Sequence, residues 1–177
     1  MSSSLLANRW VQRIRRGGQS LLLLWVVAGV GHLAGMRLEP GPEQPIPFSH
    51  RVHAGDKEIS CLFCHPYADR SQKAGMPSVD KCLLCHSVIV THFPPIQKLR
   101  GYGDRQQPVP WQRVNRLADF VFFNHEMHIL RGIDCGQCHG DVRGMDRIQP
   151  VHPFKMGFCV SCHRTEQAST DCYTCHR

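Results

Sequence analysis

Apolar residues are unevenly distributed along this chain of 177 residues. Residues 21–36 are almost wholly apolar and follow a basic stretch without acidic residues, which is typical of a signal sequence or a signal anchor. We expect residues 1–19 to form a cytoplasmic basic N-terminus and residues 20–37 to form a retained transmembrane signal anchor. Cleavage as a signal peptide is the alternative, but no clear small-residue cleavage site precedes Arg37.

The positive-inside rule orients such an anchor. It predicts a single-pass protein of the cytoplasmic (inner) membrane, with everything after the anchor on the periplasmic side. Residues 38–47 contain four prolines and a glycine, so we expect a stiff Pro-rich linker there.

Residues 48–177 show no sustained strand alternation and no helix pattern longer than a few turns. We therefore expect a mainly α domain with little regular structure, whose core is supplied by a cofactor. Residues 87–122 form an insert rich in proline and glycine. An insert of that length is more often an interaction surface than an idle loop.

The ten cysteines of the chain form five C-x-x-C pairs, and a histidine follows each pair at once. In C-x-x-C-H the two thiols add to the haem vinyl groups, and the histidine ligates the iron as the proximal ligand. Zinc sites also use C-x-x-C pairs but do not require a histidine after every pair. A thioredoxin-like redox role lacks its βαβ pattern. We predict five covalently bound haem c groups, attached at Cys61, Cys64 and His65; Cys82, Cys85 and His86; Cys135, Cys138 and His139; Cys159, Cys162 and His163; Cys172, Cys175 and His176.

An internal repeat supplies candidates for the distal iron ligands. The pattern F-x-H-x-x-H precedes the first and the third motif, and each copy continues to a second motif. Two histidines three residues apart on a helical turn can reach neighbouring irons, whereas solvated surface histidines are the alternative. The predicted distal ligands are His50, His53, His125 and His128, with the fifth among His152, Met156 and His92. If none of the last three binds, one iron has an open face and a small-molecule reaction becomes possible.

The formal net charge of +7 does not indicate nucleic-acid binding. Five arginines and no acidic residue in residues 1–37 supply +5 of it, and the rest of the chain has 16 basic and 14 acidic side chains. Haem propionates would also occupy much of the remaining basic surface. We expect no nucleic-acid partner.

Four segments carry a resemblance to a known family, and they read IPFSHRVHAGDKEISCLFCH, PVPWQRVNRLADFVFFNHEMH, RGIDCGQCHG and KMGFCVSCHR. In this order, with five motifs of multihaem cytochrome c type in c7-like repeats, the chain resembles the pentahaem cytochrome subunit of alternative complex III. The family usually has histidine where this chain has Asn115. If that histidine is a ligand there, His92 or another group must replace it here.

The resemblance implies the partners. In that family a quinol-oxidising complex passes electrons from its membrane subunits through an iron–sulfur subunit to this cytochrome. The cytochrome hands them to a periplasmic acceptor, which is a cytochrome c, a copper protein or an oxidase. The chain could instead serve another complex, such as a molybdopterin-enzyme-like or a photosynthetic assembly.

The expected function is electron transfer by a membrane-anchored pentahaem cytochrome within a quinol-oxidising respiratory or photosynthetic complex. The subunit would not be an enzyme by itself, because the polypeptide provides ligation, distance and dielectric while the iron carries the electron. One alternative is a stand-alone anchored multihaem quinol dehydrogenase that feeds a periplasmic reductase. Another is a haem-dependent reductase with an open iron.

Overall fold

The structure is a computed structural model that describes residues 18–29 and 41–177. The chain divides into two units, residues 1–38 and 39–177. In the first unit, the described residues 18–29 are helical. A helix that crosses a membrane needs about 20 consecutive residues, most of them apolar.

The predicted transmembrane helix over residues 20–37 is therefore not supported. Among the described residues, no helix combines the length and the apolar character needed to cross a membrane. The prediction of a single-pass inner-membrane protein, which depended on that helix, is wrong for the same reason. Residues 30–37 of the predicted span and 1–17 of the predicted cytoplasmic segment lie outside the described residues.

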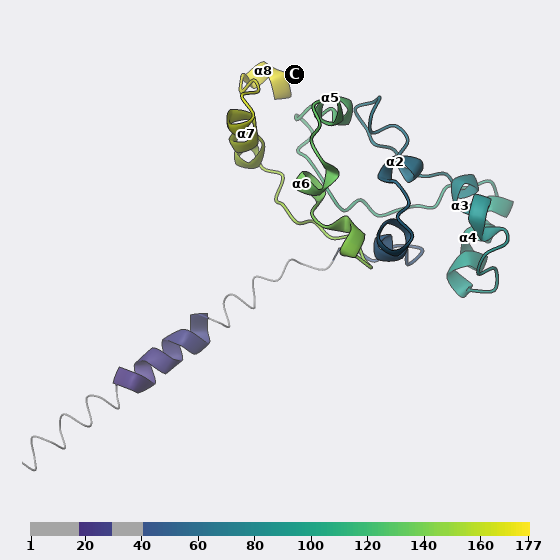
Figure 1. The fold of residues 1–177 in the computed structure, drawn as a ribbon, viewed down its shortest axis with the longest axis horizontal. Helices are drawn as coiled ribbons and strands as arrows, with labels where there is room; N and C mark the ends of the chain where they lie inside the picture. The colour runs from purple at the N-terminus through teal and green to yellow at the C-terminus, as the bar shows by residue number, and fades with distance from the viewer. Residues whose placement is uncertain (1–17, 30–40) are drawn as a thin grey trace, which may run out of the picture. The chain divides into compact units, whose positions relative to one another are not determined.

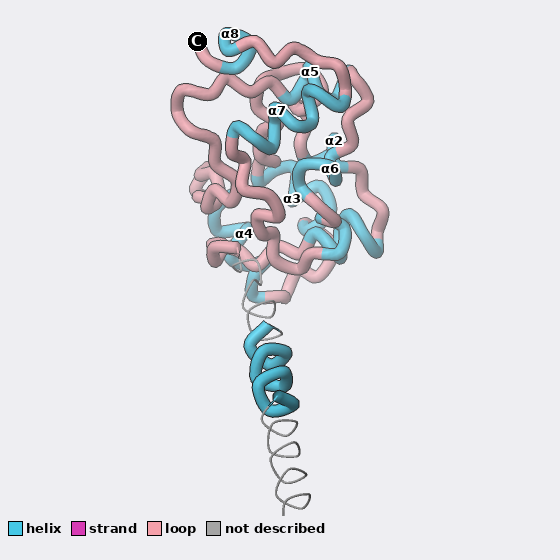
Figure 2. Tube along the Cα trace, turned by 90° about the vertical axis from the view of Figure 1, so that its left-hand side faces the viewer, coloured by secondary structure: helices cyan, strands magenta, loops and turns pink. Residues whose placement is uncertain are grey.

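The second unit consists of short helices joined by long loops, and it has no strand within residues 41–177 (Figures 1 and 2). The helical character agrees with the prediction for this part of the chain. Its elements in chain order are η1 (Arg51–Asp56), α2 (Cys61–Cys64), α3 (Val79–His86), α4 (Pro94–Asp104), α5 (His125–Leu130), α6 (Cys135–His139), η2 (Val142–Gly144), α7 (Met156–Thr165) and α8 (Cys172–Cys175).

Three of the five helices that carry the C-x-x-C-H motifs begin at a residue whose side chain caps the helix. The Ser78 hydroxyl accepts a hydrogen bond from a backbone N–H of α3, and the Asp134 and Asp171 carboxylates do the same for α6 and α8. Capping satisfies N–H groups that have no partner inside the helix. After His139, Gly140 ends α6 with a φ of 70°, and a Cβ there would lie 2.9 Å from Val151. Short polar residues thus fix where α3, α6 and α8 begin, and Gly140 fixes where α6 ends.

A small hydrophobic core lies between α3 and α4. Leu99 and Ile96 of α4 are buried, and they cluster with Val79 of α3 and with Val109. Two prolines open α4 at a position where their missing N–H groups cost nothing. Part of the predicted insert, residues 87–122, therefore packs as core.

Residues of the predicted linker also pack on this unit. Ile46 belongs to the same hydrophobic core. The Gln44 side-chain amide donates to the backbone carbonyl of Gln112 at 3.0 Å and accepts from its N–H at 2.9 Å. Residues 41–47, the described part of the segment 38–47, are thereby tied to the strand-free loop that follows α4.

The two copies of the F-x-H-x-x-H repeat have the same local geometry. Phe48 lies 4.9 Å and 4.4 Å from its two histidines, and Phe123 lies 4.8 Å and 4.5 Å from its own, measured between ring centres. In each copy an isoleucine N–H donates to the carbonyl of the second histidine. The residue before that isoleucine has a positive φ, and it is Glu58 in one copy and Gly132 in the other. Gly132 therefore corresponds in structure to Glu58.

Candidate functional site

All ten cysteines lie in the described part of the chain, and none is in a disulfide. Burial raises the pKa of five thiols, which belong to Cys64, Cys82, Cys135, Cys138 and Cys159. Redox-active C-x-x-C pairs have the opposite property, because a lowered pKa generates the reactive thiolate. A raised pKa keeps these five thiols protonated at neutral pH, which favours cofactor attachment over thiol–disulfide chemistry.

Each C-x-x-C pair lies on a helical turn. Helices α2, α6 and α8 start at the first cysteine of a motif, and α3, α6 and α7 contain a whole motif. On a helix, residues three and four positions apart share one face. The two sulfur atoms of a pair can thus approach one side of the same flat ring, with the following histidine beneath it.

Three of the predicted distal histidines face the histidine of a motif. Two imidazoles bound to one metal from opposite sides would have ring centres roughly 6–6.5 Å apart, given a metal–nitrogen bond of about 2 Å. The observed ring centres are 6.0 Å apart for His53 and His86, 6.5 Å for His125 and His139, and 6.1 Å for His128 and His163.

The fourth predicted distal ligand, His50, neighbours His65 of the first motif. Burial, with smaller contributions from His65 and His53, lowers the pKa of His50 to about 4. His50 is therefore neutral at pH 7, as a metal-binding imidazole must be. Its Nδ1 atom is buried and has no hydrogen-bond partner.

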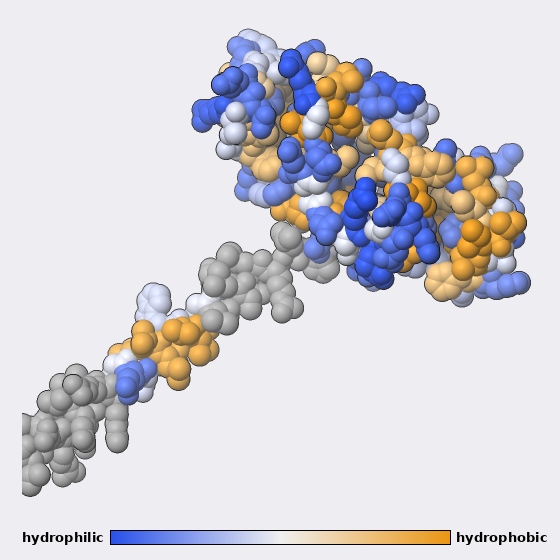
Figure 3. Space-filling model, in the orientation of Figure 1, coloured by the Kyte–Doolittle hydropathy of each residue, from blue (hydrophilic) through white to orange (hydrophobic). Residues whose placement is uncertain are grey.

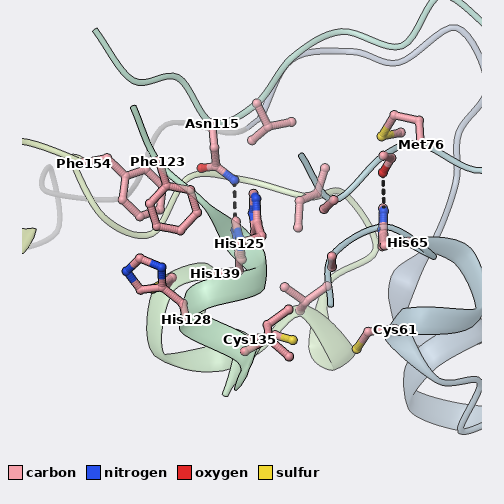
Figure 4. A pocket seen from close by; sticks show the side chains of 18 of the residues that line it. Cys61, His65, Met76, Asn115, Phe123, His125, His128, Cys135, His139 and Phe154 are labelled. Carbon is pink, nitrogen blue, oxygen red and sulfur yellow. Dashed lines mark hydrogen bonds between the residues drawn. The ribbon is translucent and has the colours of Figure 1, made fainter. Parts of the chain in front are cut away.

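Hydrogen bonds orient most of these imidazoles through Nδ1. When Nδ1–H donates to a carbonyl oxygen, the lone pair of Nε2 is left free for a metal. Seven of the nine site histidines have such a backbone carbonyl within 3.2 Å: His65 at Gly75, His86 at Ile89, His163 at Ser169, His176 at Phe120, His53 at Ser49, His125 at Gln72 and His128 at Asn124. Besides His50, the exception is His139, whose Nδ1 lies 3.1 Å from the side-chain amide of Asn115 (Figure 4).

These carbonyl partners could not be predicted from the sequence, because every residue has a backbone carbonyl and the residue type does not mark which one is used. Asn115 did stand out, but only as a departure from the resembling family. Its contact with His139, 24 positions away, appears only in the folded chain.

The fifth motif has no imidazole opposite it within the described residues. The His176 ring contacts Phe120, with ring centres 5.6 Å apart. Of the three candidates for the fifth distal ligand, His152 stacks on Phe158 at 4.7 Å and His92 is exposed in the loop before α4. Met156 is also exposed, and it alone of the three lines the cavity described next.

A cavity of about 3170 Å³ connects the motifs and is lined by the nine site histidines. Pockets for one small molecule are about 300–1,000 Å³. Large apolar side chains that line it are left exposed, among them Phe63 at 43%, Phe120 at 66% and Met127 at 56%. Apolar walls, paired imidazoles and unpaired thiols fit several large, flat, thiol-attached iron macrocycles.

The motifs follow one another in space in an order that differs from the sequence. Burial is the largest cause of the raised pKa of Cys82, Cys135, Cys138 and Cys159, and a thiol of a different motif adds to it in each case. These neighbouring thiols are Cys64 for Cys82, Cys61 for Cys135, Cys162 for Cys138 and Cys175 for Cys159. The resulting order is second, first, third, fourth and fifth motif. Figure 1 shows the corresponding helices α3, α2, α6, α7 and α8 succeeding one another across the unit.

Known proteins that are similar to this chain are cytochromes c, in agreement with a haem-binding site. The family described as cytochrome c7 and related cytochrome c matches residues 121–177, which contain the last three motifs. A menaquinone reductase, multihaem cytochrome c subunit, from Nitratidesulfovibrio vulgaris is 31% identical over 163 residues, covering 76% of this chain and 77% of that protein. The chain therefore belongs to the multihaem cytochromes c, which hold haem c covalently through such motifs.

Proposed function

We propose that this chain carries electrons along a row of five covalently attached haem c groups, as a subunit of a quinone-linked respiratory complex. The observation that carries the proposal is the combination of five C-x-x-C-H motifs with imidazoles that face them across one continuous cavity. When bound, haem supplies a one-electron redox couple at its iron.

The polypeptide would contribute attachment, ligation and a dry environment. The ten cysteines hold the groups at fixed positions, and the histidine of each motif is the proximal ligand. His50, His53, His125 and His128 are the proposed distal ligands to the first, second, third and fourth motif, in that order. Met156 is the proposed fifth, since it lines the cavity and a thioether ligand raises the potential of a haem.

Two kinds of complex are compatible with such a carrier. The segments of residues 46–177 resemble the pentahaem subunit of alternative complex III, which favours electron flow out of quinol. The relative from N. vulgaris is named for a menaquinone reductase, which favours flow toward quinone. In either case the partners are other subunits of the complex, and the carrier is not catalytic alone.

Haem counting tests the carrier proposal. Intact mass of the protein isolated with its cofactor should exceed the polypeptide mass by five haem groups, and no free thiol should remain. Replacing both Cys172 and Cys175 with serine should reduce the count to four, whereas Tyr173→Ala between them should leave five. Two or more free thiols in the wild-type protein would contradict the proposal.

The direction of electron flow needs the native complex. After the complex is isolated with its subunits identified, its haem groups should become reduced on addition of menaquinol if the alternative complex III resemblance holds. Reoxidation of prereduced haem groups by a menaquinone analogue would instead favour the menaquinone reductase relationship. An isolated complex without any quinone-reactive subunit would reject both.

A further inference from the structure

Asn115 is the one side chain that takes a position held by backbone carbonyls elsewhere in the described site. Seven site histidines have a carbonyl oxygen at Nδ1, whereas His139 has the amide of Asn115 at 3.1 Å. The repeat-related histidine of the first copy, His65, uses the carbonyl of Gly75 at 2.8 Å. The two copies thus differ at this contact, although their second histidines, His53 and His128, each have the carbonyl four residues earlier at Nδ1.

The proton must be on Nδ1 of His139 if Nε2 is to bind iron. An amide that donated its N–H to Nδ1 would force the proton onto Nε2 and block ligation. A half turn of the amide about its last side-chain bond presents the oxygen instead, and such amide orientations follow from the hydrogen-bond network. With iron on Nε2, the Nδ1–H of His139 would donate to the Asn115 oxygen.

A hydrogen bond at this position acts on the metal through its ligand. A stronger acceptor at Nδ1 makes the imidazole more basic, which stabilises the ferric iron and lowers the reduction potential. A backbone carbonyl has nearly the same acceptor strength at every residue. The acceptor strength at a side-chain position depends on the residue type and can be changed by substitution. The third motif also lies in the middle of the spatial order, between the first and the fourth.

We propose that Asn115 is a positioning residue that holds the His139 imidazole and sets the potential of the haem at the third motif. The inference rests on the proposed function, because it needs His139 as an iron ligand. Asn115 acts through His139 and touches no reacting atom itself. Its location in the loop between α4 and α5 links the insert to the central haem group.

Redox titration of three haem-loaded variants tests the proposal. Asn115→Asp supplies a charged acceptor and should lower one of the five midpoint potentials, whereas Asn115→Leu removes the acceptor and should raise it. We expect at least a tenfold change in the oxidised-to-reduced ratio of that haem, which is about 59 mV for a one-electron couple. Gln112→Leu removes an exposed amide from the same loop and should leave all five potentials unchanged.

Haem count and spin state separate the possible failures. A wild-type protein without five covalent haem groups would overturn the proposed function, and the role of Asn115 with it. Five low-spin haem groups with unchanged potentials in both Asn115 variants would overturn the role of Asn115 alone. Shifts in the same direction for aspartate and leucine, or a new high-spin haem in either variant, would also overturn it, since the first indicates general disruption and the second a direct ligand. If the leucine variant loses haem, the test depends on the near-isosteric aspartate variant. One lowered midpoint potential in that variant supports the role of Asn115, and five unchanged potentials overturn it.

Discussion

Three of the four proposed distal histidines, His53, His125 and His128, face the histidine of a C-x-x-C-H motif. Their ring centres lie at the separation that one intervening metal requires, and a backbone carbonyl lies at the Nδ1 atom of each. Covalent attachment depends on other residues, the motif cysteines. Ligation and attachment can therefore be separated by substitution.

Replacing any one of four distal histidines with alanine should leave five haem groups attached and convert about one fifth of them from low to high spin. The variants are His50→Ala, His53→Ala, His125→Ala and His128→Ala. Optical and EPR spectra measure the spin state, and intact mass measures attachment. Lys98→Ala, an exposed change on α4, is the control and should change neither.

Low-spin spectra in all four variants would show that these histidines are not ligands. The same measurement applies to the fifth position. Met156→Ala should produce the high-spin fraction there, and His152→Ala and His92→Ala should not. The reverse pattern would assign the fifth ligand to one of those histidines.

Short helices in this unit serve mainly to place motif residues, and α4 is different. It spans Pro94–Asp104 and buries Leu99 to 4% exposure against α3. Helix α3 carries the second motif, so the packing of α4 stabilises one end of the row of motifs. In Figure 3 apolar residues also reach the surface beside these two helices.

Leu99→Ala should lower the stability of the haem-loaded protein by about 2–4 kcal/mol, because it leaves a cavity in a small core. The melting temperature should fall by on the order of 10 °C. Leu84→Ala on α3 removes a leucine that is 64% exposed, and it should change stability by at most about 0.5 kcal/mol. Equal melting temperatures for the two variants would contradict the assignment of this core, and circular dichroism on heating measures them.

In the proposed carrier, the row of motifs would set the path of the electrons, since they would pass only between neighbouring haem groups. The structure places the first motif between the second and the third. Removing the group at the first motif should therefore isolate the group at the second. If the motifs were arranged in space in the order of the sequence, the first motif would be terminal, and its loss would leave the groups at the second to fifth motifs connected.

Replacing Cys61 and Cys64 with serine tests this order. The haem groups are then reduced in a rapid-mixing experiment by a partner that binds at the end of the fifth motif. The groups at the third, fourth and fifth motifs should be reduced together, whereas the group at the second motif should be reduced slowly. Replacing Cys82 and Cys85 is the matched control, because the second motif is terminal and its loss should leave all four connected. Four equally connected groups in the first variant would reject the spatial order.

Local sequence was sufficient to predict the attachment sites of this protein, which stay predictions. Cysteines at i and i+3 and a histidine at i+4 must share one face of a helical turn wherever they occur, so the motif specifies its own geometry. The repeat likewise predicted equivalent surroundings for His53 and His128, and the structure has them. Membership of the multihaem cytochromes c follows from such local patterns. The number of haem groups and the ligand roles stay predictions.

Contacts between distant parts of the chain could not be read in this way. Which distal histidine faces which motif, the placement of the first motif between the second and third, and the contact of Asn115 with His139 depend on how the loops return. Composition alone also led to a wrong prediction. The apolar run near the N-terminus predicted a transmembrane helix that the described residues do not contain. Hydrophobicity and spacing act along the chain, whereas pairing and order are set by packing between segments that the sequence keeps far apart.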